Sequence, residues 1–261
     1  MGAVAGDRLE LLADPAVRSA LSRELGRSIE HHGRIASTQE RARELADAGA
    51  DDALVVADEQ TAGHGRQGRP WIAPAGTALL ASWVFRPLLA DPALFALLAG
   101  VAVARSLAAL GVPDARLKWP NDVQLHGRKV AGALADAITS TDGGALVLGI
   151  GVNVHQSAAD LGELGGIATS LAIEGHAVDR LALLCRLTEQ LDRIAHATDE
   201  RRAALDEWRA RASMLGVEVE VRSAAGPAVR GVARALADDG ALVLDTAAGS
   251  QRIVAGEVSL S

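Results

Sequence analysis

The first half of the chain alternates between apolar runs and polar, helix-forming stretches. Residues 37–49 open with Ser and Thr, carry an early Glu and close with Gly, so they predict a short helix. The apolar run at residues 53–57 predicts a buried strand, and the Ala- and Leu-rich stretch at residues 92–110 predicts a helix. Further strands are expected at residues 79–85, 115–118, 123–125, 129–138 and 146–154. Strands and helices in this order predict an α+β fold, a mixed sheet backed by helices.

The pattern changes after Ser213. Residues 178–194 and 199–211 have the apolar spacing of amphipathic helices, whereas the later segments alternate apolar and polar residues around an Asp239–Gly240 turn. This alternation predicts a small β-barrel. We therefore expect an N-terminal extension (residues 1–30), a main domain (31–212) and the barrel (213–261).

Composition and charge narrow the classes of function. A net charge of −7 and only six aromatic residues, four Trp and two Phe, argue against binding to nucleic acid. The single cysteine, Cys185, excludes an intrachain disulfide framework, and its apolar setting predicts an inert buried thiol. The N-terminus lacks a signal-peptide pattern and the longest apolar run is too short to span a bilayer, so we expect a cytoplasmic protein without membrane contact. The adjacent His31 and His32 are expected at the surface.

A long loop without helix or strand periodicity, residues 59–76, is the first candidate for chemistry. It contains G-H-G-R-Q-G-R-P-W at residues 63–71, in which glycines let the backbone approach a ligand while Arg66 and Arg69 supply cationic donors. This combination predicts an anionic ligand, although a solvated Gly/Arg loop explains it equally well in isolation. The segment lacks the G-K-[ST] ending of a phosphate-binding P-loop.

A second candidate is K-W-P-N-D-V at residues 118–123, where Asn121 and Asp122 follow a strand and could face a ligand or Mg²⁺. A structural turn explains this pair as well. A hairpin turn at His126–Gly127 leads to Lys129, whose apolar surroundings would require pairing with an anion if the side chain is buried, and an exposed hairpin lysine explains the pattern equally well. The segment G-I-G-V-N at residues 149–153 would allow a ligand to approach closely.

Taken in order, S-T-Q at residue 37, E-Q-T-A-G-H-G-R-Q-G-R-P-W at 59, K-W-P-N-D-V at 118, K-V-A-G at 129, G-I-G-V-N at 149 and G-E-V-S-L at 256 closely resemble biotin–protein ligases. The resemblance runs from about residue 34 to the end. It implies a catalytic domain of the biotin/lipoate ligase type followed by an SH3-like barrel. It also implies a reaction in which biotin and MgATP form biotinyl-5′-adenylate, after which a lysine of a biotin carboxyl carrier domain receives the biotinyl group.

The resemblance also implies roles for individual residues. The catalytic groups would be Lys129, Arg66 and Asp122. Biotin would contact a set of mostly small and polar residues, with the ureido ring on the first three: Ser37, Thr38, Gln60, Gly63, His64, Arg66, Lys129, Gly132 and Gly149. ATP or the adenylate would contact a more cationic set: Arg66, Arg69, Trp71, Asn121, Asp122, Lys129, Gly151 and Asn153. No residue set is singled out as a metal site, and Mg²⁺ is expected to accompany ATP near Asp122.

Two positions depart from the family's usual pattern. His64 stands where an arginine is common, which puts retention of the adenylate in question, and Asp136 stands where Glu is common. Since few residues precede Ser37, we expect a ligase without a DNA-binding repressor domain, acting as a monomer or weak homodimer. The alternatives are a lipoate or octanoate ligase of the same fold, which the polar Ser37, Thr38 and Gln60 disfavour, and a non-catalytic anion-binding protein.

Overall fold

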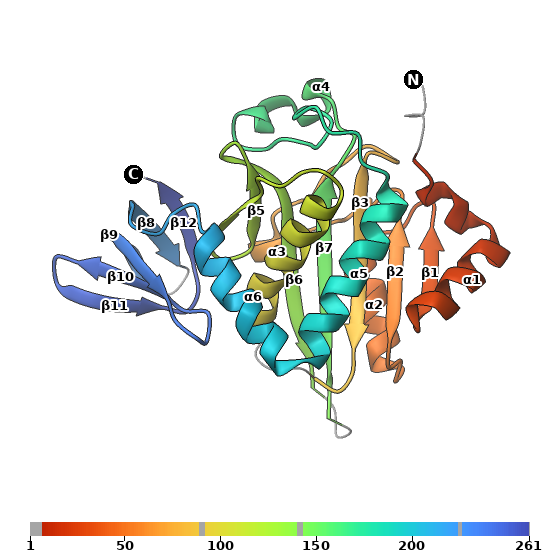
Figure 1. Ribbon diagram of the computed structural model, residues 1–261, viewed down its shortest axis with the longest axis horizontal. Coiled ribbons are helices and arrows are strands. Elements are labelled where there is room, and N and C mark those ends of the chain that lie inside the picture. The colour runs from red at the N-terminus through yellow and green to blue at the C-terminus, as the bar shows by residue number, and fades with distance from the viewer. Residues whose placement is uncertain (1–6, 89–91, 140–142, 224–225, 261) are drawn as a thin grey trace.

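The computed structural model describes residues 7–88, 92–139, 143–223 and 226–260, and Figure 1 shows two sheets of unequal size. The larger sheet has seven strands in the order β1-β2-β3-β7-β6-β5-β4. Among its described strands, β1 and β2 pair in parallel and the other neighbours are antiparallel. Its strands are β1 (Ser28–His32), β2 (Ala53–Ala57), β3 (Ala78–Phe85), β4 (Arg116–Lys118), β5 (Asp122–Leu125), β6 (Arg128–Ile138) and β7 (Ala145–Asn153).

Helices cover both faces of this sheet, which makes its central strands apolar on both sides. On β2, Leu54 and Val56 join the main core formed with α3 (Pro92–Ala109), α5 (Arg180–His196) and α6 (Thr198–Arg211). Val55 lies in a second cluster with Ala42 and Ala46 of α2 (Thr38–Asp47), on the opposite face. In Figure 1, α3, α5 and α6 lie in front of the sheet and α2 behind it.

Helix α3 is long and apolar enough to cross a membrane by composition, but most of it is buried inside the protein. It contacts α5, α6 and β6. The same apolar surface that would suit a bilayer is therefore covered by neighbouring elements, as in the core helix of a globular domain.

Local sequence sets where the elements begin and turn. Ser37 caps α2, since its hydroxyl accepts from the N–H of Glu40. The β5–β6 hairpin turns at His126 (φ 48°) and Gly127 (φ 78°), and positive φ at both positions is the requirement of a two-residue hairpin turn. The predicted hairpin is therefore confirmed, as are the predicted helices and the other predicted strands to within about two residues.

The N-terminal segment contributes more than the sequence indicated. Its elements are η1 (Leu9–Ala13), α1 (Pro15–Leu25) and the edge strand β1; Leu9 and Leu12 are fully buried in the main core. The expectation that His31 lies at the surface is wrong: its side chain on β1 is 5% exposed, with Nε2 3.1 Å from the Asp58 carboxylate. Residues 1–6 of the expected extension lie outside the described residues.

The C-terminal segment forms a five-stranded antiparallel sheet in the order β11-β10-β9-β8-β12. Among the described residues, no strand pairing joins the end strands β11 and β12. Its strands are β8 (Glu218–Ser223), β9 (Gly226–Leu236), β10 (Leu242–Thr246), β11 (Gly249–Ile253) and β12 (Glu257–Leu260). Trp119 Nε1 donates to the carbonyl of Gly240 at 3.0 Å, so the tryptophan of K-W-P-N-D joins the two sheets.

Candidate active site

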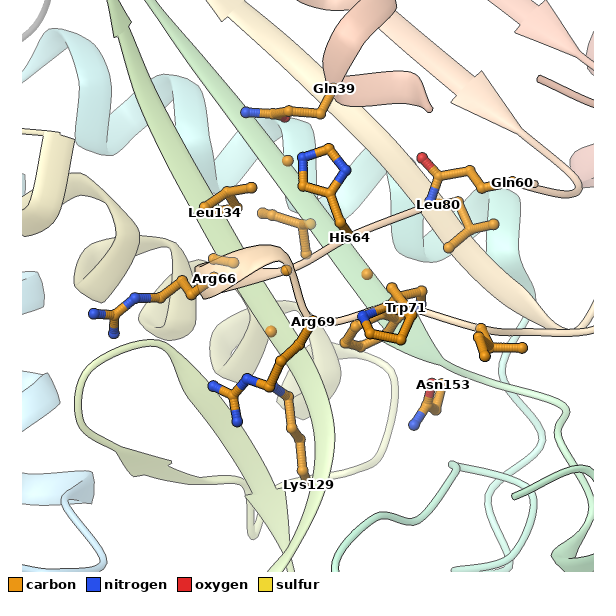
Figure 2. Close-up of a pocket in the computed structure, with 18 of the residues that line it drawn as sticks. Gln39, Gln60, His64, Arg66, Arg69, Trp71, Leu80, Lys129, Leu134 and Asn153 are labelled. Carbon is orange, nitrogen blue, oxygen red and sulfur yellow. The ribbon is translucent and has the colours of Figure 1, made fainter. Parts of the chain in front are cut away.

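A cavity of about 290 Å³ lies on the α2 face of the large sheet. Its walls come from the N-terminal end of α2, the loop that follows β2, strands β3, β6 and β7, and residues 161–168. Figure 2 shows Gln39 and Gln60 toward one end of this pocket and Arg69 and Lys129 toward the other, with Trp71 between them.

Most of the residues predicted from the sequence meet here. Those that line the cavity are Thr38, Gln60, His64, Arg66, Arg69, Trp71, Asn121, Lys129, Gly132, Gly149, Gly151 and Asn153. Three predicted residues lie behind this lining. Ser37 is used as the cap of α2, Gly63 supports the loop, and Asp122 pairs with Lys129.

The loop between β2 and β3 is folded back on itself. Trp71 N–H donates to Gly63 O at 2.8 Å and Gly65 N–H donates to Arg69 O at 2.7 Å, around the turn η2 (Arg66–Gly68). A side chain at Gly63 would meet Gln60 Nε2 at 2.7 Å and Trp71 O at 2.9 Å. Glycine is therefore required there to bring Trp71 back over the sheet.

Trp71 rests on two glycine-containing strands. A Cβ atom at Gly151 would lie 2.6 Å from carbons of the indole, so the ring sits directly on the backbone of β7. Lys129 Nζ of β6 lies 5.6 Å from the ring centroid, and the indole Nε1 is buried without a partner. This edge of the ring faces the backbone of β7, because a Cβ atom at Gly151 would lie 3.1 Å from Nε1.

The end of the cavity near α2 is polar and uncharged. Thr38 N–H donates to Gln60 Oε1 at 2.7 Å, and Thr38 Oγ1 lies 2.9 Å from Ser82 Oγ. His64 lies nearby: its Nδ1 is 3.3 Å from Ala62 O and its Nε2 is 3.7 Å from the Glu40 carboxylate. This end offers neutral hydrogen-bonding groups to a buried polar ring.

The opposite end is cationic, with Arg66, Arg69 and Lys129 in its walls. No carboxylate is among the described residues that line the cavity. Lys129 Nζ lies 2.6 Å from Asp122 Oδ1, just behind the lining. Burial lowers the pKa of the Arg66 guanidinium, the Asp122 charge opposes this shift, and the Arg69 charge adds to it. Cations gathered in this way suit a ligand with more than one negative charge.

Arg69 connects the cavity to the smaller sheet. Its guanidinium contacts the Glu257 carboxylate at the start of β12. Glu257 belongs to the G-E-V-S-L segment singled out in the sequence.

The two asparagines of the predicted nucleotide contacts are engaged within the protein. Asn121 Nδ2 donates to Ala133 O at 2.6 Å. Asn153 Nδ2 donates to Thr169 O, and its Oδ1 accepts from Gln156 Nε2, both at 2.9 Å. Asn153 therefore connects β7 to the segment that closes one side of the cavity.

Sequence reasoning missed three parts of the lining. Gln39 directly follows the predicted Ser37–Thr38 pair, and Ser82 is the one polar residue in the otherwise apolar strand β3. The third part is an apolar rim from residues 161–168, in which Leu164 and Ile167 are 52% and 70% exposed. Ser82 carried a usable signal, because a buried polar residue needs a partner.

No cluster of three or more metal-ligating side chains occurs in the described ranges. Two carboxylates lie beside the cationic end, Asp122 against Lys129 and Glu257 against Arg69. Mg²⁺ commonly binds proteins through one or two carboxylates, with substrate phosphates and water completing its shell. The residues present therefore fit a metal ion carried in by a nucleotide and do not form a cage of their own.

Comparison with known proteins identifies the family. Residues 33–153 match the biotin/lipoate A/B protein ligase family, and residues 214–261 match the biotin protein ligase C-terminal domain. The biotin–[acetyl-CoA-carboxylase] ligase of Mycobacterium tuberculosis is 38% identical over 226 residues, which cover 83% of this chain and 82% of that protein.

A bifunctional ligase/repressor of Bacillus spizizenii is 34% identical over 262 residues, covering 95% of this chain and 79% of that protein. The structure of the Aquifex aeolicus biotin protein ligase in complex with biotin and ATP superposes with a TM-score of 0.73 at 29% identity. That match covers 89% of this chain and 98% of the other. The chain belongs to the biotin–protein ligase family.

Proposed function

We propose that this cavity joins biotin to the α-phosphate of ATP and passes the biotinyl group to a lysine of a biotin carboxyl carrier domain. The observation that carries the proposal is the chemical division of the cavity. Neutral hydrogen-bonding groups lie at one end, Arg66, Arg69 and Lys129 lie at the other, and the described lining contains no carboxylate. Biotin has the same division, with a cyclic urea at one end and a carboxylate at the other.

The cationic end would lower the main barrier to the first step, which is the repulsion between the biotin carboxylate and the α-phosphate. A biotin carboxylate oxygen attacks the α-phosphorus, the bond to the β-phosphate oxygen breaks, and pyrophosphate leaves. Lys129 and Arg66 would neutralise the carboxylate and α-phosphate as they meet and would stabilise charge that develops in the transition state. Trp71, with its unpaired buried Nε1, would lie against the adenine.

In the second step the carrier lysine attacks the acyl carbon of the mixed anhydride. The new amide bond forms as the bond to the phosphate oxygen breaks, and AMP leaves with the shared electron pair. The amine must lose a proton during this step. Asp122 is the carboxylate paired with Lys129, and it would serve either the incoming amine or the Mg²⁺ that accompanies the nucleotide.

ATP–pyrophosphate exchange tests the proposal. The purified chain is incubated with ATP, labelled pyrophosphate and one of biotin, lipoate or octanoate. Exchange stimulated by biotin and not by the other two acids is expected, since neither lipoate nor octanoate matches the polar end of the cavity. Stimulation by lipoate or octanoate alone would assign the chain to the other branch of the fold. If none of the three acids stimulates exchange, the chain would be a non-catalytic anion-binding protein.

A further inference from the structure

A continuous line of polar side chains runs from the neutral end of the cavity to the protein surface. Thr38 Oγ1 lies 3.0 Å from Gln60 Oε1 and 2.9 Å from Ser82 Oγ, and Ser82 Oγ donates to Gln39 Oε1 at 3.1 Å. Gln39 Nε2 then donates to Asp136 Oδ2 at 2.6 Å. Asp136 is a quarter exposed and does not line the cavity. The complete line is Gln60, Thr38, Ser82, Gln39, Asp136 and Arg43.

The orientation of the Gln39 amide is fixed by what surrounds it. Its Nε2 lies between two groups that can only accept, the Asp136 carboxylate at 2.6 Å and the carbonyl of Val147 at 3.2 Å. Arg43 pairs with the same Asp136 oxygen at 2.7 Å. Both amide hydrogens are therefore donated away from the cavity, and Oε1 must face Ser82.

The fixed amide sets the direction of the two hydroxyls. Gln39 Oε1 can only accept, so Ser82 must donate its single proton to it. The proton of Thr38 is then directed to one of two acceptors, Ser82 Oγ or Gln60 Oε1. Toward a ligand, Thr38 offers lone pairs only. Within the described chain no hydrogen bond uses Gln60 Nε2, which is left as a donor.

An acceptor beside a donor is the complement of a cyclic urea, which presents N–H donors and a carbonyl acceptor. We infer that Asp136 and Gln39 are positioning residues that fix the hydrogen-bond polarity of the cavity for a urea, although Asp136 does not line it. The inference rests on the proposed function and adds to it a reason for selectivity. Lipoate and octanoate would leave the aligned groups without partners, and unpaired buried polar groups discriminate strongly.

Removing the anchor should let the amide turn over. In Asp136→Ala only the Val147 carbonyl still holds Nε2, so Gln39 can present Nε2 to Ser82. Ser82 then donates to Thr38, and the Thr38 proton is set against the urea N–H wherever it is not donated to Gln60 Oε1. The probes are biotin and desthiobiotin, which share the urea and differ in the sulfur ring. We expect calorimetric Kd values for both ligands to rise by about 10- to 100-fold. The KM for ATP, and kcat at saturating biotin, should stay within about threefold of the wild-type values.

Three further variants make the test specific. Asp136→Glu keeps the acceptor and should restore most of the affinity. Gln39→Met removes the amide at similar volume and should reproduce the loss, so it carries the test if Asp136→Ala does not fold. Arg41→Gln, on the same helix, loses ion pairs with Glu30 and Glu44 away from the cavity and should bind biotin normally.

The outcomes separate this inference from the proposed function. If the wild type shows biotin-stimulated exchange and folded Asp136→Ala and Gln39→Met keep their Kd values within threefold, the positioning role is refuted. The same holds if KM for ATP rises and kcat declines together with the loss of biotin affinity, because that pattern indicates general loosening of the site. If the wild type shows no biotin-stimulated exchange, the proposed function itself fails.

Discussion

The Lys129→Ala substitution tests whether the charge of Lys129 serves catalysis or the stability of the fold. Lys129 Nζ and Asp122 Oδ1 form a 2.6 Å ion pair whose side chains are 32% and 24% exposed. Pairs with this much solvent contact contribute about 0–1 kcal/mol to stability. The backbone of Lys129 keeps its hydrogen bonds with Ile167 and Thr169 in the variant. The free energy of unfolding should therefore decrease by at most about 1 kcal/mol.

The effect on adenylation should be much larger. One preorganised donor aimed at developing charge contributes about 10²- to 10³-fold in rate, or roughly 2.7–4 kcal/mol. Biotin-dependent ATP–pyrophosphate exchange should decrease by that factor in Lys129→Ala. Lys129→Arg should lie between the two, because it retains the charge but not the compact ammonium.

Arg186→Ala is the control, since it removes a surface ion pair, with Glu189, outside the cavity. It should leave exchange unchanged. The reasoning is refuted if Lys129→Ala melts normally and exchanges pyrophosphate within twofold of wild type. It is also refuted if the variant unfolds so readily that loss of structure explains the loss of rate.

Further predictions concern the packing of Trp71 on Gly151, the stability of the fold at low pH, and residues 59–76. Gly151→Ala places a methyl group 2.6 Å from the Trp71 ring, so the indole must shift; KM for ATP should rise about tenfold, and an unchanged KM would contradict the packing. Burial raises the pKa of Asp7, but contacts with His155 and Arg180 outweigh it and keep the folded pKa below 3.8. Asp7 therefore stabilises the fold above about pH 4 and loses this effect as the pH decreases further. Asp7→Asn should cost about 1–3 kcal/mol at pH 7 by urea denaturation and less at pH 2; equal losses at both values would refute this. Biotin with ATP should protect residues 59–76 from proteolysis, because a glycine-rich loop loses much conformational freedom on ordering; equal cleavage rates would count against it.

The elements that sequence predicts well are those whose pattern is local. Residues 53–57 form an apolar run that is buried on both faces, and residues 37–49 carry their own cap and closing glycine, so both were predicted closely. Strand β1 was missed because S-I-E-H-H has a single buried apolar residue, Ile29; it becomes a strand by pairing with β2. The burial of His31 follows from that pairing and from Asp58.

The residues of the cavity also divide into those that local motifs predict and those that become apparent only from contacts in the folded structure. Glycine- and arginine-containing motifs identified most of the cavity lining, because those residue types are required where backbone approaches a ligand or where anions bind. Gln39 and Ser82 were missed because their importance lies in contacts with Asp136 and Thr38 that join α2, β3 and β6. The role of Ser37 was predicted as a ligand contact, whereas the structure places its hydroxyl on the end of α2.

The most direct test of the proposed function is to measure the mass of a biotin carboxyl carrier domain after its reaction with this chain. A biotin carboxyl carrier domain is incubated with the purified chain, biotin and MgATP, and its intact mass is measured, followed by peptide mapping. A gain of one biotinyl group on a single lysine is expected, dependent on ATP and slowed by about 10²- to 10³-fold with Lys129→Ala. An unmodified carrier, or one that gains a lipoyl or octanoyl group in place of biotin when those acids are supplied, would contradict it.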